Sequence, residues 1–313
     1  LILDEPTAVL TPQETDKLFA VMRNMKADGK SLIIITHKLH EVLDVSDRVA
    51  VLRKGEYIGD VLTKDADQQS LTDMMVGHSV SLNINRPTPV NVEPRLKIEG
   101  LTVFDELGVK RLDNVSFTVN AGEVLGVSGL MGAGRTEIMR AVFGADPIDS
   151  GKIKIKGKEV HIKSPRQAIH HGIAFLTEDR KGQGLVLAQT IRTNLILANM
   201  KGFSSGLFLN EKKILEAGEQ NIASLRIKTP SIDEIVGQLS GGNQQKVVIG
   251  KWVNTDAEIF IFDEPTRGID VGAKVEVYNV MNSLVKQGKC VIMVSSEMPE
   301  TVSYTHLTLP TIA

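Results

Sequence analysis

The sequence has almost no cysteine, no excess of either charge and no long apolar run. Cys290 is the single cysteine among 313 residues, which excludes a disulfide framework and favours a reducing compartment. Lysine and arginine number 36 against 38 aspartates and glutamates, so the charge gives no argument for nucleic acid as the main partner. No apolar run approaches the roughly 18–20 residues that span a bilayer.

The chain opens with LILDEP rather than with a methionine and a signal peptide. These residues resemble a strand entered midway, so we expect the chain to be part of a longer cytoplasmic protein. Cys290 begins the apolar stretch CVIMVSS, and we expect it to be buried in a core.

Two stretches of the chain repeat each other without a gap. With Asp4 set on Asp263, LILDEPTAVL…THKLHEV aligns with IFIFDEPTRGI…VSSEMPET. The shared residues include Asp-Glu-Pro-Thr and a closing glutamate, Glu41 on Glu300. A repeat of this length predicts two homologous domains.

The repeat also sets the expected boundaries. Residues 1–80 form the C-terminal part of a first domain, residues 81–95 a proline-containing linker, and residues 96–300 a second domain. Residues 301–313, TVSYTHLTLPTIA, match nothing in the first copy. We expect this tail to be non-native, with ordinary divergence at a domain end as the alternative.

The pattern of apolar runs predicts an α/β fold. The runs LIL, SLIII, VLGVS, GIAFL, EIFIF and CVIMV have the continuous character of parallel strands covered on both faces. A helix over residues 12–28 is predicted by Thr11, Pro12 and Glu14, which are typical of a capping box with proline in the first turn. Antiparallel hairpins are predicted at VAVLRKGEYIGDV and GKIKIKGKEVHI.

The stretch VLGVSGLMGAGRTE fits the phosphate-loop spacing Gly-x-x-x-x-Gly-Lys-Ser/Thr at every position except one, where Arg135 replaces lysine. A strand precedes it and a helix pattern follows, so its backbone N–H groups could converge on phosphate. Thr136 could supply a hydroxyl to Mg²⁺. Arginine is a wide planar fork rather than a compact charge, so we expect binding to survive better than catalysis. A simple strand–helix turn is the alternative. The candidate nucleotide-binding residues here are Gly129, Gly132, Ala133, Gly134, Arg135 and Thr136.

Each copy of the repeat ends a buried strand with two carboxylates. In open α/β sheets ligands bind at that edge. The first acid, Asp4 or Asp263, suits a hold on Mg²⁺, and the second, Glu5 or Glu264, suits polarising an attacking water. Solvated acids at the start of a loop are the alternative, which the repetition makes less attractive.

The stretch LSGGNQQK supplies a second anion-binding helix start at Ser240, Gly241 and Gly242, about twenty residues before IFIFDEP. A glycine-rich helix cap is the alternative. The order of motifs, GLMGAGRTE, TEDRKGQGL, LSGGNQQK, DEPTRGIDVGAK and VSSEMPE, resembles the tandem ATP-binding cassette (ABC) ATPases of bacterial ribose/galactose/xylose-type sugar importers. The resemblance covers essentially residues 1–300.

That resemblance implies a P-loop NTPase fold with a mainly parallel core sheet, an antiparallel β subdomain and a helical signature subdomain. It implies ATP and Mg²⁺ as cofactors and head-to-tail pairing of two cassettes, each ATP lying between one phosphate loop and the other signature loop. Ser240, Gly241 and Gly242 would then complete the first site. That site would use Asp4 for Mg²⁺, Glu5 as base and His37 as the switch histidine.

The second site departs from the family pattern. Arg135 replaces lysine, Ser296 stands opposite His37, and Glu178 stands at the position usually held by glutamine. The resemblance therefore implies a site that binds ATP and hydrolyses it poorly. Phe104 could stack on adenine or fill a core.

The resemblance also implies membrane permease subunits as partners, a periplasmic sugar-binding protein acting indirectly, and a peripheral location on the cytoplasmic face of the inner membrane. No nucleic acid is expected, and the fragment alone is expected to be inactive. An importer for nucleosides or another small solute, and a soluble cassette ATPase without a membrane partner, are the alternatives. The identity of the sugar is not encoded in these residues.

Overall fold

The computed structural model describes residues 1–7, 10–36, 38–53, 55–77, 93–129 and 132–296. His37, most of the expected linker and the expected tail at 301–313 lie outside these residues. The chain divides into two units, residues 1–83 with 270–275, and residues 84–269 with 276–313. Each unit is described by itself.

Over the described part of residues 1–83, the first unit has a two-stranded parallel sheet, an antiparallel hairpin, three α-helices and a 3₁₀ turn at Thr63–Asp65. Its longest helix is the predicted one: the Thr11 side chain accepts a hydrogen bond from the Glu14 amide, and the Glu14 side chain returns to the Thr11 backbone. The predicted hairpin is also present. The elements are β1 (Ile2–Asp4), α1 (Pro12–Ala27), β2 (Ile33–Ile35), α2 (Leu39–Val45), β3 (Arg48–Arg53), β4 (Glu56–Leu62) and α3 (Gln68–Val76).

The core of the first unit lies between the hairpin and its helices, where Leu39, Val51 and Leu71 form a buried cluster. The two parallel strands are covered incompletely, with Ile2 68% and Ile33 57% exposed. Their runs were predicted to be covered on both faces, which is wrong for this unit. A two-stranded sheet that packs on one side leaves the alternate side chains in solvent.

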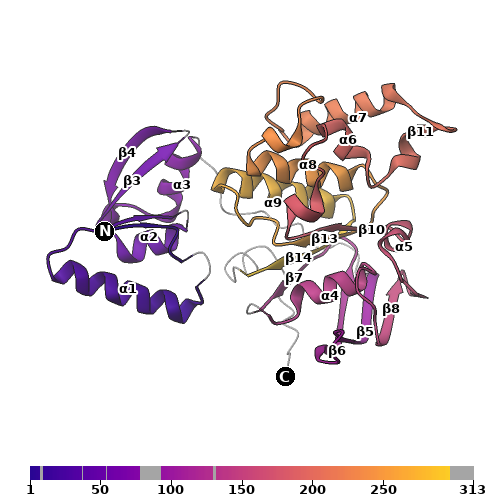
Figure 1. The fold of residues 1–313 in the computed structure, drawn as a ribbon, viewed down its shortest axis with the longest axis horizontal. Coiled ribbons are helices and arrows are strands. Elements are labelled where there is room, and N and C mark those ends of the chain that lie inside the picture. Colours follow the sequence, from indigo (N-terminus) through magenta and orange to yellow (C-terminus); the bar gives the residue numbers. More distant parts are fainter. Residues whose placement is uncertain (8–9, 37, 54, 78–92, 130–131, 297–313) are drawn as a thin grey trace. The chain divides into compact units, whose positions relative to one another are not determined.

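The second unit is built on a four-stranded parallel sheet in the order β10-β13-β14-β7. Every residue of β10, β13 and β14 is buried, as the continuous apolar runs predicted for strands covered on both faces. Cys290 is fully buried at the start of β14, which confirms its expected core position. Helix α4 (Arg135–Val142) contacts β13, and helix α8 (Gly241–Val253) contacts β10 (Figure 1). The strands are β7 (Val124–Ser128), β10 (Ile173–Leu176), β13 (Ile259–Asp263) and β14 (Cys290–Ser295).

An antiparallel sheet in the order β6-β5-β8-β9 also belongs to the second unit. It contains the second predicted hairpin, β8 with β9. Strand β5 begins at Pro94, so its first two residues lie inside the segment expected to be linker. Proline is tolerated at the first position of a strand, where its missing N–H is not needed. The strands are β5 (Pro94–Phe104), β6 (Lys110–Asn120), β8 (Ser150–Ile155) and β9 (Lys158–Val160).

Helices and short turns complete the second unit. A π-helical turn, η2 (Arg180–Gly184), follows β10, and α6 packs against α7 and α8. Helix α9 has residues in both units. No helix in the described part of the chain combines the length and apolar character needed to cross a membrane. The helices are α4 (Arg135–Val142), α5 (Pro165–His170), α6 (Ile191–Ile196), α7 (Glu211–Ser224), α8 (Gly241–Val253) and α9 (Val271–Lys286), with 3₁₀ turns at Met200–Phe203 and Val236–Gln238 and a small pair β11 (Ser204–Ser205) and β12 (Phe208–Leu209).

Candidate nucleotide-binding site

The carboxyl ends of three strands bring three motifs to one edge of the sheet in the second unit. Asp263, the last residue of β13, is in register with Val294 of β14. Ser295, the last residue of β14, is in register with Ser128, the last of β7. The Ser128 hydroxyl donates to the Ser295 carbonyl at 3.4 Å. Because ligands bind at this edge in open α/β sheets, the candidate site lies here.

The phosphate loop leads from β7 into α4 through glycines with left-handed backbone. Gly132 has φ 82° and Gly134 has φ 83°. A Cβ on Gly134 would lie 2.8 Å from Leu112 and 3.1 Å from the Arg111 carbonyl, so a larger residue there would clash and be strained. The loop ends at the N-terminus of α4, where free backbone N–H groups favour phosphate. The structure describes every expected loop residue: Gly129, Gly132, Ala133, Gly134, Arg135 and Thr136.

Asp263 is a buried carboxylate, 1% exposed. Neither of its oxygens has a well-formed hydrogen bond to any residue that the structure describes. The pKa of Asp263 is raised to about 6 because the side chain is buried. The nearby Thr136 hydroxyl and Arg135 guanidinium offset only part of that rise. An ionised carboxylate in this position is costly unless a cation partners it.

These residues fit a Mg²⁺ ion. Asp263 and Thr136 offer the carboxylate and hydroxyl oxygens that Mg²⁺ prefers, and nucleotide phosphates and water supply the rest. Within the described chain there is no cluster of three or more His, Cys, Asp or Glu side chains that could hold a metal. A site with one or two protein ligands is the kind that Mg²⁺ uses with phosphates.

Arg135 contacts the expected catalytic base of the same site. Its Nη1 lies 3.2 Å from Oε1 of Glu264, with 12% and 8% of the two side chains exposed. The Ser296 hydroxyl donates to the other oxygen, Oε2, at 3.1 Å. Burial raises the pKa of Glu264, and the Arg135 charge opposes that rise. A general base needs its carboxylate directed at the attacking water, and both oxygens of Glu264 are engaged by protein groups.

Glu5 and Glu264 share an unusual backbone conformation. Their φ angles are 44° and 47°, a region that side chains other than glycine seldom occupy. Each glutamate directly follows its strand and donates its amide to the neighbouring strand, Glu5 to the Ile35 carbonyl at 2.8 Å and Glu264 to the Val294 carbonyl at 2.9 Å. The two units therefore build the same turn at the same place in the repeat.

The segment after β10 is attached to the loop after β13. Glu178 forms an ion pair with Arg267. Arg180 donates from Nη1 to the Arg267 carbonyl at 3.0 Å and from Nη2 to the Gly268 carbonyl at 3.2 Å. The expected place of Glu178 beside the γ-phosphate remains a prediction.

The glycine-rich start of α8 lies against the same arginine. A Cβ on Gly241 would lie 2.7 Å from Nη2 of Arg180 and 3.3 Å from the Gly268 carbonyl, so this glycine permits a close approach. Ser240 is exposed just before the helix and accepts a hydrogen bond from Asn243 at 3.0 Å. With Gly242 half-buried beside it, this helix start has the character of an anion-binding end.

In the first unit, Asp4 ends β1 in register with Ile35 of β2, and Glu5 follows it. Both carboxylates are exposed, in contrast to their buried counterparts Asp263 and Glu264. The predicted switch histidine, His37, lies outside the described residues.

Phe104 ends β5 and is 39% exposed, with Nζ of Lys110 at 6.0 Å from its ring. It does not fill a core, so that interpretation is wrong, and its ring remains available for stacking on a base.

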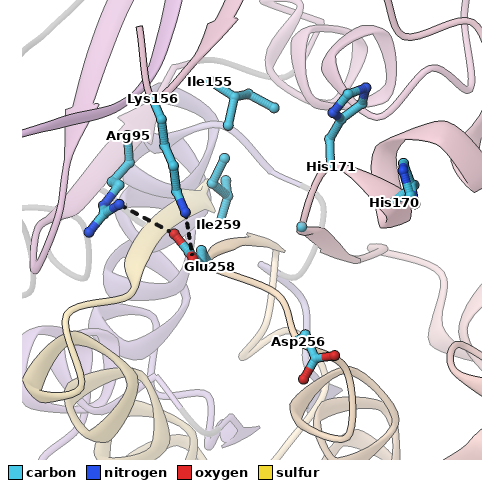
Figure 2. A pocket seen from close by; sticks show the side chains of 9 residues that line it. Arg95, Ile155, Lys156, His170, His171, Asp256, Glu258 and Ile259 are labelled. Carbon is cyan, nitrogen blue, oxygen red and sulfur yellow. Dashed lines mark hydrogen bonds and ion pairs between the residues drawn. The ribbon is translucent and has the colours of Figure 1, made fainter. Parts of the chain in front are cut away.

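A cavity of about 220 Å³ lies at the opposite end of the parallel sheet (Figure 2). Glu258, directly before β13, binds Arg95 at 3.5 Å and Lys156 at 2.8 Å. The Lys156 hydrogen bond lowers the pKa of Glu258 more than burial raises it. Glu258 occupies both cations and Asp256 adds a second negative charge to the lining, so the cavity is a poor site for a nucleotide phosphate.

The parallel core sheet, the phosphate loop at its carboxyl edge and the added antiparallel sheet define a nucleotide-binding domain of the P-loop NTPase class. Residues 112–267 match the family model described as "ABC transporter". The chain belongs to the ABC transporter family.

Two relatives illustrate the match. The ribose import ATP-binding protein RbsA of Geobacillus kaustophilus is 47% identical over 302 residues, which are 96% of this chain and 60% of that protein. A putative ribose/galactose/methyl galactoside import ATP-binding protein of Burkholderia lata is 42% identical over 308 residues, 98% of this chain and 59% of that protein. The chain thus spans about three fifths of the length of the curated relatives it matches.

Among solved structures, a nucleotide-free ATP-binding cassette from an ABC transporter superposes with a TM-score of 0.59. It is 23% identical and covers 68% of this chain and 85% of its own. At that identity the likeness establishes the fold, which agrees with the α/β P-loop architecture expected from the motifs.

Three contacts at these sites were not predicted from the sequence. They are the Arg135–Glu264 ion pair, the attachment of Arg180 to the loop after β13, and a buried contact between Thr7 and Glu41. The repeat contained a signal for the last one, since Asp-Glu-Pro-Thr and the closing glutamate occur in both copies. Nothing in the local sequence indicates the first two.

Proposed function

We propose that the full-length protein is the ATP-hydrolysing subunit of a bacterial importer for a ribose-like or galactose-like monosaccharide. It would act on the cytoplasmic face of the inner membrane with permease subunits, and indirectly with a periplasmic sugar-binding protein. The names of the relatives support this proposal, since they are import ATP-binding proteins for ribose, or for ribose, galactose and methyl galactoside.

We propose two unequal ATP sites. In the first, Asp4 holds Mg²⁺, Glu5 acts as the base and His37 contacts the γ-phosphate or the attacking water. The signature residues Ser240, Gly241 and Gly242 complete this site by head-to-tail pairing of the cassettes. The exposed carboxylates of the first unit and the glycine-rich start of α8 support these roles.

The second site binds ATP and hydrolyses it poorly. Its phosphate loop binds the phosphates, Asp263 and Thr136 hold Mg²⁺, and Glu178 lies near the γ-phosphate. The observation that carries this proposal is the Arg135–Glu264 ion pair at 3.2 Å, with Ser296 on the second oxygen. A guanidinium that binds the base cannot at the same time act fully on the phosphates, and both oxygens of the base are already engaged by protein groups.

The test compares Glu5→Gln with Glu264→Gln in the full-length subunit assembled with its membrane subunits. We expect Glu5→Gln to lower ATP turnover by on the order of 10²–10³, the usual effect of losing one transition-state contact. We expect Glu264→Gln to leave turnover within about twofold, because its carboxylate is already engaged.

Binding of a fluorescent ATP analogue in the same samples should remain in both variants. If both substitutions abolish turnover, Glu264 is a working base and the two sites are equivalent. Stimulation of turnover by a binding protein loaded with ribose or galactose, compared with one loaded with a nucleoside, identifies the class of cargo.

A further inference from the structure

A buried polar contact joins the turn after β1 to the first turn of α2 in the first unit. The Thr7 hydroxyl donates to Oε2 of Glu41 at 2.6 Å, and the two residues are 1% and 2% exposed. A carboxylate this deeply buried needs several partners to offset its lost hydration.

Lys38 and Thr36 supply the other partners of Glu41. Nζ of Lys38 lies 3.2 Å from Oε1 of Glu41 and donates to the Thr7 carbonyl at 3.0 Å. The Thr36 hydroxyl lies 3.5 Å from Oε2 of Glu41, and it accepts from the Lys38 amide at 3.1 Å. Thr7 is therefore held through both its hydroxyl and its carbonyl.

The turn after β1 and the start of α2, joined in this way, adjoin the residues that carry the proposed chemistry. Thr7 lies two residues after Glu5, in the turn where Glu5 has φ 44°. Thr36 and Lys38 flank His37 in the sequence. Glu41 thus connects the turn that contains Glu5 and Thr7 with Thr36 and Lys38, the two neighbours of the expected switch histidine.

The repeat supports a role beyond local packing. Thr266 stands at the position of Thr7 and is also buried, 2% exposed. Glu300, at the position of Glu41, lies outside the described residues. The threonine and the glutamate are present in both copies, although Ser296 replaces the histidine in the second. What both copies share is the left-handed glutamate after the strand, at φ 44° and 47°.

We infer that Glu41 and Thr7 are positioning residues whose buried hydrogen bond holds the turn of the base Glu5 in its working conformation. This inference rests on the proposed function of the first site. Both side chains are buried and contact protein groups, so their loss should act on the rate of the chemical step more than on ATP binding.

The experiment measures ATP turnover by the full-length subunit with its membrane subunits, using Thr7→Val, Thr7→Ser and Glu41→Gln. Valine keeps the shape of threonine and removes the hydroxyl, whereas serine keeps the hydroxyl. We expect Thr7→Val to lower kcat about tenfold, because the turn of the base loses a hydrogen bond to a charged group, with KM within about twofold. Thr7→Ser should recover most of kcat, and Glu41→Gln should resemble Thr7→Val.

Arg23→Ala is the matched control, because Arg23 makes an exposed ion pair with Asp44 in the same unit and exposed pairs contribute little. It should leave both kcat and KM unchanged. Equal kcat for Thr7→Val and Thr7→Ser would overturn the inference, and so would a change confined to KM.

Hydrogen exchange separates this inference from the proposed function. The Glu5 amide bonds to the Ile35 carbonyl, and its exchange should accelerate in Thr7→Val but not in Thr7→Ser. Absence of ATP turnover in the unmodified protein would contradict the proposed function alone. An unchanged exchange rate of the Glu5 amide in Thr7→Val would contradict the positioning role, whatever the rate of ATP turnover. The same measurement tests the role in a variant whose thermal stability is lowered.

Discussion

The buried carboxylate of Asp263 is a titrating group of the second site. Its folded pKa is about 6 against an ordinary value of 3.8, so the folded protein binds this proton more tightly than the unfolded chain does. The stability from this difference is fully present below pH 4 and is lost as the pH rises to about 6. Above that pH the ionised carboxylate destabilises the nucleotide-free protein by at most about 3 kcal/mol, for two pKa units at 1.36 kcal/mol each.

We therefore expect Asp263→Asn to be more stable than the unmodified protein at pH 7.5 without nucleotide and Mg²⁺. The gain should shrink to nothing near pH 4. Denaturant titrations at several pH values measure it. Asp256→Asn is the control, since Asp256 is exposed and should show no pH-dependent gain. If Asp263→Asn is less stable than the unmodified protein at pH 7.5, the buried carboxylate does not destabilise the nucleotide-free protein.

For individual residues, the sequence identified the residue types of the site and their order along the chain. It could not identify which side chains contact each other. Arg135 was expected to alter the phosphate loop because it departs from the lysine of the motif. That its guanidinium reaches Glu264, 129 positions later in the chain, depends on the order of strands in the sheet. Sequence spacing carries no information about such a contact.

At the scale of elements, η2 connects three motifs through one side chain. Arg180 begins η2, donates to the carbonyls of Arg267 and Gly268, and lies against Gly241 at the start of α8. We expect Arg180→Ala to loosen the loop after β13, because two carbonyls lose their charged donor. Limited trypsin digestion followed by mass spectrometry should show severalfold faster cleavage after Arg267.

Arg166→Ala provides the comparison for that digestion. Arg166 is an exposed arginine of α5, and its removal should leave the rate of cleavage after Arg267 unchanged. Equal rates in Arg180→Ala and Arg166→Ala would show that the loop is held by other contacts.

The strands of the second unit could be predicted because four apolar runs report burial directly, and a parallel sheet buries whole strands. The helix α1 could be predicted because its cap is local chemistry. The π-helical turn η2 could not, since it is bound by the loop after β13, whose carbonyls accept from Arg180, and by a buried lysine, Lys251, which donates to the Gly184 carbonyl at 2.7 Å. Both partners are distant in the sequence.

At the scale of the whole chain, the two units differ in how much apolar surface they bury. The parallel strands of the first unit expose Ile2 and Ile33, whereas the second unit buries three complete strands. Since burial of apolar surface is the main favourable contribution to folding, we expect this 313-residue chain to unfold in two steps, the first unit before the second.

Trp252 makes these steps separable. It is the single tryptophan and lies 6% exposed in α8 of the second unit, so its fluorescence reports that unit alone. On heating, helical circular dichroism should begin to fall several degrees before the fluorescence changes. Coincident transitions would mean that the two units unfold cooperatively.

The left-handed glutamates at 5 and 264 have a consequence for anyone who tries to make this protein more robust. A non-glycine residue at φ 44° or 47° costs about 1 kcal/mol that glycine would not. At Glu264 the buried ion pair with Arg135 outweighs that gain, but Glu5 is exposed. A library screened for heat resistance would therefore enrich glycine at position 5, and the variants with the highest melting points would include ones that have lost the base. Stabilisation campaigns should hold that codon fixed.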